Sequence, residues 1–420
     1  MLAKFKKKYI GDWDFYQKYL LLAIPMILQN AITNLVSFLD NIMVGQLGTE
    51  QMSGVAIVNQ LIFVYNLAIF GAVSAASIFG AQYFGKGNHK GHMYSFRFKL
   101  YATLLVTGGA ILLFLTKGSA LISLYLTDTV GNGATDLALQ YGLEYLAIMM
   151  VGLIPFAVNQ SYATNIKETG QTFIPMLASF VAVGTNAILD YLMIFGIGPF
   201  PELGVQGAAL ATVIARYIEA LIVVIWAHIH RGKNRYLEGA YTGFGIPLAE
   251  LKAILIKGFP LMMNEVLWAA GMTTVTQCYS VRGLDVVAGL NIASTITNLF
   301  NIVYLQLGSC ISIVVGQYLG AGKLEDAKDA DNKMIVFSVF CCVIMAALMF
   351  VVGGFFPGIY NTTEEIRELA TSFIAVSAII MPFCAFSHAS YFTLRSGGKT
   401  VDGINYYLCR QPKAAGWRLA

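Results

Sequence analysis

The sequence predicts an all-α integral membrane protein whose ten transmembrane helices form two repeats. Three observations carry this prediction: an apolar composition, ten apolar runs of spanning length, and a match between the two halves of the chain. Of the 420 residues, 57% are hydrophobic and 12% are charged, whereas soluble domains carry about 25% charged residues. A soluble enzyme, a disordered chain and a nucleic-acid-binding protein are therefore disfavoured.

Ten apolar runs are long enough to cross a membrane, which takes about 20 mostly apolar residues. The runs are Tyr19–Leu39, Val55–Ala81, Leu100–Thr116, Tyr141–Asn159, Phe173–Phe195, Val205–Ala227, Gly258–Tyr279, Ala288–Val315, Met334–Gly353 and Leu369–Leu394. The longest polar stretch between them is basic and covers residues 229–257. We therefore predict an N-lobe of six helices over residues 1–228, a cytoplasmic linker over 229–257, and a C-lobe with helices seven to ten over 258–400.

Basic residues predict the orientation, because cytoplasmic segments of membrane proteins are enriched in Lys and Arg. With the N-terminus in the cytoplasm, twenty basic residues fall in cytoplasmic segments and three in outer segments. Arg97, Lys99 and Arg395 are counted among the twenty. We expect a multi-pass plasma-membrane protein with a cytoplasmic N-terminus. One missed helix would disrupt this alternation, so the charge pattern also supports the helix count.

The second half of the chain repeats the first at a shift of 235 residues, the separation of Pro25 from Pro260. The segment Gln82–Gly87 matches Gln317–Gly322 at this shift. The other matches are Gly48 with Gly283, Gly54 with Gly289, and Asn66 with Asn301. Six helices per repeat is an even number, so both halves start on the same side of the membrane. Transporters often place a binding site between such parallel halves.

The repeat also predicts that the second half is incomplete. Ser161–Thr164 matches Ser390–Thr393, and the first half then continues through two more helices. By symmetry, about 55–60 residues forming two helices are missing after Thr400. The polar tail 401–420 resembles no part of the first half and is too short to span a bilayer. We expect a truncation or a frameshift after Thr400; the alternative is a protein that ends in a cytoplasmic tail.

Five acidic residues fall within or at the ends of the predicted spans, where an ionisable group costs about 2.5–3.5 kcal/mol on insertion scales. They are Asp40, Glu144, Asp190, Glu219 and Glu265. Arg216 is the basic residue of these spans and lies three residues before Glu219. We expect Arg216 and Glu219 to neutralise each other. Glu144 lies near an outer helix end and is predicted to be interfacial.

Asp40 closes the first run and ends a polar stripe with helical spacing. The stripe consists of Gln29, Asn30, Thr33, Asn34, Ser37 and Asp40. Such a stripe should face the protein interior rather than lipid. Pro25 removes one helical hydrogen bond and favours a bend. We interpret Asp40 as a carboxylate that binds a proton or a sodium ion; the alternative is an acid that marks the outer helix end.

Asp190 lies deep in the fifth run, with Asn186 one turn before it on the same face. Their oxygens suit a hard cation such as Na⁺. Loss of hydration would instead favour a protonated Asp190. The alternative is a hydrogen-bond anchor between helices.

The second half offers one candidate acid. Glu265 lies five residues after Pro260 and aligns with Asn30, so we expect it to face the interior; the alternative is an interfacial acid. Asn66 and Asn301 belong to amide stripes on the second and eighth runs. Such stripes either pack helices together or line a polar cavity. Gln29, Asn30 and Asn34 are further cavity candidates. Both interpretations of the stripes stay open.

Enzyme signatures fail on inspection. The six cysteines form no C-x-x-C pair, and neither H-E-x-x-H nor G-x-S-x-G occurs. We therefore expect no catalytic residues, and no cofactor beyond a coupling proton or sodium ion.

Taken together, these motifs resemble the MATE (multidrug and toxic compound extrusion) transporters over residues 15–400. The motifs are Pro25 followed by Asp40, Gln82–Gly87 with its echo Gln317–Gly322, Asn186–Asp190, and Gly207–Thr212. The resemblance implies twelve helices in two lobes around a central cavity. It also implies export of cationic or amphipathic compounds against inward proton or sodium flow.

Within that family, an N-lobe coupling site looks like Asp40, Asn186, Asp190 and Thr212. Glu265 looks like the seventh-helix acid of some members. The tenth run carries no acid, although some members have one there, which weakens the case for a C-lobe sodium site. We expect small-molecule substrates, contact with membrane lipid, no nucleic-acid partner and a monomer.

Two other functions compete with antiport. A flippase for lipid-linked saccharides shares the wider architecture, but its pyrophosphate substrate should demand several basic residues in the spans, and Arg216 stands alone there. An inactive fragment or a passive pore is the third hypothesis, because two helices are expected to be missing.

Overall fold

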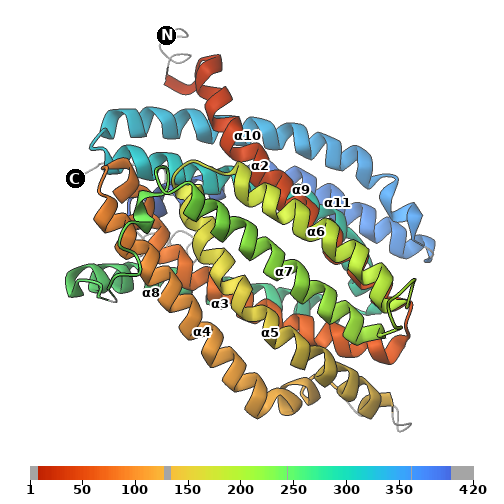
Figure 1. The fold of residues 1–420 in the computed structure, drawn as a ribbon. Coiled ribbons are helices and arrows are strands. Elements are labelled where there is room, and N and C mark those ends of the chain that lie inside the picture. Colours follow the sequence, from red (N-terminus) through yellow and green to blue (C-terminus); the bar gives the residue numbers. More distant parts are fainter. Residues whose placement is uncertain (1–7, 127–133, 244, 361, 399–420) are drawn as a thin grey trace. The chain divides into compact units, whose positions relative to one another are not determined.

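The computed structural model describes residues 8–126, 134–243, 245–360 and 362–398. The predicted tail 401–420 lies outside these ranges. Ten helices in the described part are long and apolar enough to cross a membrane, which confirms the ten predicted spans. No β-strand occurs in those ranges, so the all-α prediction is also confirmed. The helices are α2 (Trp13–Gly45), α3 (Thr49–Gly85), α4 (His89–Ser123), α5 (Ala134–Glu168), α6 (Phe173–Ile194), α7 (Gly204–Ile229), α8 (Leu248–Ser280), α9 (Leu284–Gly320), α10 (Leu324–Gly353) and α11 (Glu364–Ser396), with short 3₁₀ helices η1 (Arg235–Leu237) and η2 (Phe356–Ile359) (Figure 1).

Nine of the ten described helices extend beyond their apolar runs, because a run marks the apolar part of a helix and not its polar ends; α6 ends one residue before its run. The run Leu100–Thr116 lies inside α4, which begins eleven residues earlier at His89. Asn88 caps this start: its side-chain oxygen accepts a hydrogen bond from the Gly91 backbone N–H at 3.0 Å.

The repeated glycine motif ends two helices in the same way. Gly87 after α3 and Gly322 after α9 have φ angles of 70° and 74°, a left-handed conformation that favours glycine. The next residue then bonds back into the helix, from Asn88 N to Tyr83 O at 2.9 Å and from Lys323 N to Tyr318 O at 3.0 Å. This is the helix-ending motif that satisfies the last carbonyl groups. The sequence repeat therefore corresponds to a structural repeat at these ends.

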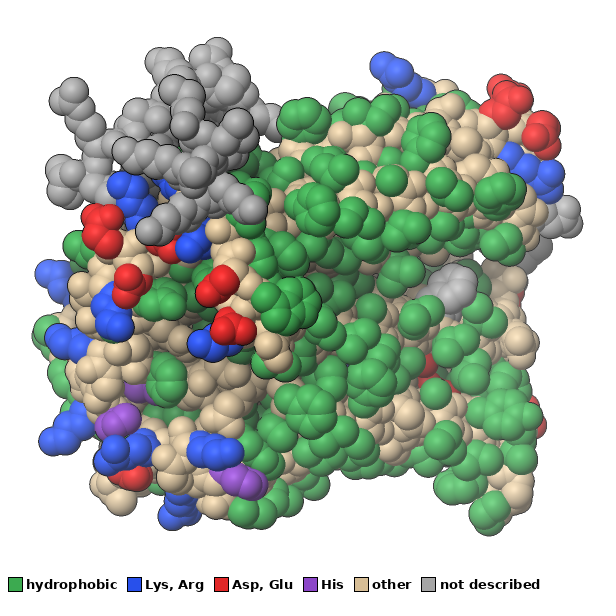
Figure 2. Space-filling model, turned by 90° about the horizontal axis from the view of Figure 1, so that it is seen from above, with side chains coloured by type: hydrophobic (Ala, Val, Ile, Leu, Met, Phe, Trp, Pro, Cys, Tyr) green, Lys and Arg blue, Asp and Glu red, His purple; other side chains and the backbone are tan. Residues whose placement is uncertain are grey.

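The chain divides into two compact units. The N-terminal unit is Trp13–Glu250, and the C-terminal unit comprises residues 1–12 and 251–420. In the N-terminal unit, α2 packs on α6, α6 on α7, α7 on α5, and α5 on α3 and α4. In the C-terminal unit, α9, α10 and α11 pack against one another. Large apolar side chains such as Leu105 in α4 remain exposed, and Figure 2 shows broad hydrophobic areas on the face in view. Such surfaces suit a hydrocarbon environment.

Small residues let the helices of the N-terminal unit approach closely. A Cβ atom on Gly54 of α3 would lie 2.5 Å from the carbonyl oxygen of Ala138 and 2.8 Å from the backbone nitrogen of Gly142, both in α5. Around this contact, apolar side chains of α3, α5 and α7 form a buried core that includes Val58 and Leu153. Close backbone approach at glycine is typical of helix packing in membranes.

Three of the cations counted in cytoplasmic segments are buried within the protein: Arg97 and Arg395 are 6% exposed and Lys99 is 0% exposed. The Lys99 Nζ atom lies 2.5 Å from Glu168 Oε1 and 2.5 Å from Asn165 Oδ1. The positive-inside rule places any cation beyond an apolar run in water. It does not detect a carboxylate on a neighbouring helix.

Arg97 holds the segment that follows α7. Its guanidinium group donates to the carbonyl oxygens of Gly239 at 2.7 Å, Ala240 at 2.9 Å and Gly245 at 2.8 Å. The Tyr83 hydroxyl also donates to the Glu250 carboxylate. Residues up to Glu250, most of the predicted linker, thus belong to the N-terminal unit.

We expect Gly54→Ala to destabilise the protein, because its Cβ would overlap backbone atoms that have little room to move. Overpacking costs about 1–3 kcal/mol in unfolding free energy. Gly184→Ala in α6 is the matched control, since no heavy atom lies within 4 Å of its Cβ position. Thermal unfolding in detergent should show a lower midpoint for the first variant only. Equal midpoints would contradict the close packing of α3 on α5.

We also expect Glu168→Gln to destabilise the chain by about 3–5 kcal/mol, because it leaves the Lys99 charge buried without its carboxylate. The control is Glu364→Gln, which removes an ion pair with Arg367 whose glutamate side chain is 76% exposed; exposed pairs contribute at most about 1 kcal/mol. Denaturant unfolding, monitored by tryptophan fluorescence, compares the two. Similar losses in both variants would be evidence against a buried Lys99–Glu168 pair.

Candidate functional site

Two carboxyl groups meet inside the N-terminal unit. Asp40 lies near the end of α2 and Asp190 lies in α6, and their side chains are close enough to interact directly. Asp190 is 1% exposed and Asp40 is half-buried. By distance and angle, Asp40 Oδ1 and both carboxyl oxygens of Asp190 accept no well-formed hydrogen bond from the described residues, although the Asn186 amide lies close enough to interact with Asp190. Two adjacent ionised carboxylates repel each other, so this arrangement favours a shared proton or a bound cation.

The other two predicted site residues lie beside this pair. Asn186 is one turn before Asp190 in α6, is 6% exposed, and donates from Nδ2 to Thr212 Oγ1 of α7 at 3.5 Å. The structure therefore brings Asp40, Asn186, Asp190 and Thr212 together from three helices. Carboxylate and amide oxygens are suitable ligands for a hard cation. In the described ranges, no three His, Cys, Asp or Glu side chains form a group that could hold a metal ion.

Sequence reasoning missed Tyr145 of α5, which completes this cluster. Its ring is 5% exposed, and its hydroxyl donates to Asn59 Oδ1 of α3 at 3.4 Å. The same hydroxyl group interacts with Asp40, Asp190 and Thr212. In the sequence, a tyrosine within an apolar run cannot be distinguished from an aromatic residue that only packs in the core.

Glu219 interacts electrostatically with Arg216 as expected, but each residue also has a closer partner on another helix. The Arg216 guanidinium lies 5.2 Å from the centre of the Phe156 ring, and its Nη1 donates to the Gly152 carbonyl oxygen at 3.4 Å. Glu219 instead accepts a hydrogen bond from the Ser179 hydroxyl. The two residues share a helix face, but α5 and α6 supply each with another partner. Arg216 also interacts with Tyr145, which places a positive charge near the carboxylate pair.

The polar stripe of α2 is partly satisfied by the protein itself. Gln29 donates from Nε2 to Ser179 Oγ of α6 at 2.7 Å, which ties α2 to α6. Asn30 and Asn34 donate to carbonyl oxygens one turn earlier in their own helix, each at 2.9 Å. Pro25 is buried, and α2 continues through it.

The remaining predicted positions lie on three other helices. Asn66 in α3 has a buried Oδ1 without a hydrogen-bond partner. Asn301 in α9 is half-buried. Pro260 lies within α8, in the repeat position of Pro25.

In the C-terminal unit, the predicted acid Glu265 faces a cation. Arg395 of α11 interacts electrostatically with Glu265 of α8. Next to them, Asn264 Nδ2 donates to the Tyr391 hydroxyl at 3.3 Å. Because Arg395 is buried in the same unit, Glu265 has a counter-charge that the sequence pattern did not predict.

The sequence analysis missed a buried acid of the C-terminal unit, Asp331. Asp331 of α10 is 9% exposed and accepts a hydrogen bond from the Thr393 hydroxyl of α11 at 2.5 Å. It escaped notice because it lies just before an apolar run, among other charged residues.

The sequence profile of the family described as MatE matches residues 25–192 and 260–412, which is more than half of the chain. The chain belongs to the MatE family. The two matched segments begin at Pro25 and Pro260, the pair that the internal repeat aligns. The first segment contains Asp40, Asn186 and Asp190.

The MatE chain is 24% identical over 400 residues to the probable multidrug resistance protein NorM of Thermotoga maritima. That alignment covers 94% of this chain and 83% of the relative. A solved outward-facing multidrug resistance MATE family transporter of the MOP superfamily matches with a TM-score of 0.83 and 19% identity, over 94% and 85% of the two chains. A solved MATE in the bent conformation matches with a TM-score of 0.81 and 20% sequence identity, over 93% of this chain and 84% of that one. These structures confirm the fold of a MATE transporter, a membrane protein with many spans.

Proposed function

We propose that this MATE protein is a secondary active antiporter that exports organic cations, drugs or toxic compounds in exchange for protons or sodium ions. The observation that carries the proposal is the Asp40–Asp190 pair, in which Asp40 Oδ1 and both carboxyl oxygens of Asp190 are buried without a well-formed hydrogen bond. The names of relatives as multidrug resistance proteins support the substrate class. The chain would lie in the plasma membrane as a monomer, with its N-terminus and residues 229–257 in the cytoplasm.

Coupling would follow from the charge of the pair. With both carboxylates ionised, the pair repels itself and attracts a cationic substrate. A bound proton or Na⁺ removes that repulsion and the attraction for a cationic substrate. The ion therefore weakens substrate binding by the same free energy by which the substrate weakens ion binding. Asn186 and Thr212 would supply further oxygens, and Tyr145 would donate to whichever carboxylate is ionised.

Movement of α2 would connect the pair to the lobes. Asp40 lies fifteen residues after Pro25, where α2 lacks one helical hydrogen bond. One solved relative carries the description of a bent conformation, and we propose that α2 has similar freedom here. The N-lobe of residues 1–228 and the C-lobe of 258–400 would then alternate between two states. We propose Gln29, Asn30, Asn34, Asn66 and Asn301 as polar residues for substrate contact, with Pro260 and Glu265 as counterparts in the second lobe.

Asp40→Asn and Asp190→Asn should each reduce gradient-driven export of a cationic dye to the background of protein-free vesicles, while the amount of folded protein stays the same. Glu144→Gln is the control, because this acid hydrogen-bonds to Gln140 and Gln206 at 3.0 and 3.2 Å and lies outside the cluster. Export is measured in proteoliposomes. Normal export by both aspartate variants would refute the assignment. Flux that persists after the gradient is collapsed would indicate a passive pore.

The coupling ion should compete with the substrate for the pair. In wild-type protein, tetraphenylphosphonium affinity should fall as pH is lowered, by up to about tenfold per pH unit for one displaced proton, or fall as Na⁺ is added at constant pH. The ion that competes is the coupling ion. Asp190→Asn should lose this dependence. Equilibrium binding to purified protein provides the measurement, and affinity that responds to neither ion would contradict competition at a shared site.

A further inference from the structure

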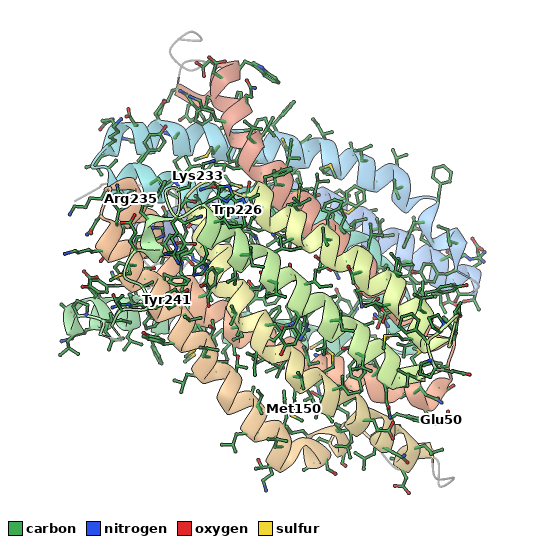
Figure 3. All side chains as sticks on the ribbon, in the orientation of Figure 1. Glu50, Met150, Trp226, Lys233, Arg235 and Tyr241 are labelled. Atoms are coloured by element: carbon green, nitrogen blue, oxygen red, sulfur yellow. The ribbon has the colours of Figure 1, made fainter. Side chains whose placement is uncertain are left out.

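A cavity of about 190 Å³ lies in the N-terminal unit, at the start of α4. Its lining includes His89 and His92 of α4, Thr169 just after α5, and Lys233, Arg235 and Tyr236 of the segment after α7. Figure 3 shows Lys233 and Arg235 at one end of this unit and Glu50 at the other. The proposed antiport does not use these residues, and the inference below is independent of it.

The rim of the cavity is positively charged. Lys233 and Arg235 are both exposed, and Lys233 makes no ion pair within the described ranges. Arg235 lies 3.6 Å from Glu238, but both side chains are more than half exposed, and such pairs are weak. Both cations can therefore turn toward a ligand.

The Glu168 carboxylate, which lies next to the cavity residue His92, is already paired with Lys99. Glu168 lies 2.5 Å from Lys99 Nζ through Oε1 and 3.5 Å from His92 Nε2 through Oε2. His92 lines the cavity, and its ring centre lies 4.9 Å from that of Tyr236. The local charge balance thus stays positive, which favours an anion over a cation.

A buried hydroxyl gives independent evidence for a ligand. Tyr236 is 1% exposed and lines the cavity, yet its hydroxyl oxygen has no hydrogen-bond partner. Burial, and then the charge of Glu168, raise the pKa of Tyr236 above its usual range, so the hydroxyl remains a donor. An unpaired buried hydroxyl costs about 1–3 kcal/mol, and a ligand oxygen would remove this cost.

The geometry of the donors selects a polyatomic oxyanion. An arginine guanidinium, a lysine and a tyrosine hydroxyl from the segment after α7 line the cavity beside the positive end of α4. Phosphate offers several oxygens in different directions, which matches bidentate arginine contacts and helix N-termini. We propose that this cavity binds a phosphate group, carried either by an anionic lipid headgroup at the membrane surface or by a free phosphate compound.

The test uses the full-length purified protein and two probes. Native mass spectrometry counts phosphatidylglycerol bound in competition with phosphatidylcholine, and thermal unfolding in neutral detergent measures stabilisation by inorganic phosphate. The variants are Lys233→Gln with Arg235→Gln, and Tyr236→Phe. The control Lys86→Gln with Arg231→Gln removes the same charge from exposed residues outside the cavity lining.

For the probe that binds, the Lys233/Arg235 variant should lose at least about tenfold in affinity, as expected for two charge-assisted contacts. The conservative Tyr236→Phe should lose about two- to tenfold, and the control should stay within about twofold. Binding of phosphatidylglycerol alone would assign the site to a lipid headgroup, and binding of inorganic phosphate to a free phosphate compound. If neither probe binds, or if the variants bind like the control, the proposal is wrong.

Discussion

The structure depends on one constraint: an ionisable group that enters an apolar helical unit must find a partner there. Lys99 meets this constraint through Glu168 and Asn165, and Arg97 through three carbonyl oxygens of the segment after α7. Arg395 interacts electrostatically with Glu265, and its guanidinium lies 5.4 Å from the centre of the Phe392 ring. Burying a charge without such partners costs several kcal/mol, so these contacts determine which helices can lie next to each other.

Against that background, Asp40 and Asp190 are exceptional. They face each other and form no ion pair with a described cation, and Asp40 Oδ1 and both Asp190 oxygens lack a well-formed hydrogen bond. The surrounding helices hold them in place: α2 is tied to α6 by the Gln29–Ser179 hydrogen bond, and α7 is tied to α6 through Asn186 and Thr212. In the proposed antiporter, a proton or a cation would bind these carboxyl oxygens and relieve the repulsion between the two carboxylates. This is the physical requirement for coupling in the proposed antiporter.

The same reasoning connects the two ends of the N-terminal unit. Near the start of α4, the Glu168 carboxylate is already paired with the buried Lys99. The exposed cations Lys233 and Arg235 of the cavity lining are not neutralised by it. Arg97 holds the chain that carries Lys233 and Arg235 against α4. A phosphate group bound in this cavity would add contacts between α4 and the segment after α7, which leads into α8.

Hydrophobic run length alone determined the ten spans, and the spacing of Pro25 and Pro260 determined the repeat, because both features depend on local composition and order along the chain. The sequence also singled out Asp40, Asn186 and Asp190, since polar groups in apolar runs are rare. Only the tertiary structure decided which charges are compensated. The structure changed the interpretation of four residues, because each has partners on another helix: Tyr145, Arg216, Lys99 and Arg395. Lys99 and Glu168, for example, lie 69 residues apart along the chain. A pairing between distant helices leaves no periodic trace in the sequence, so it appears only when the helices are packed.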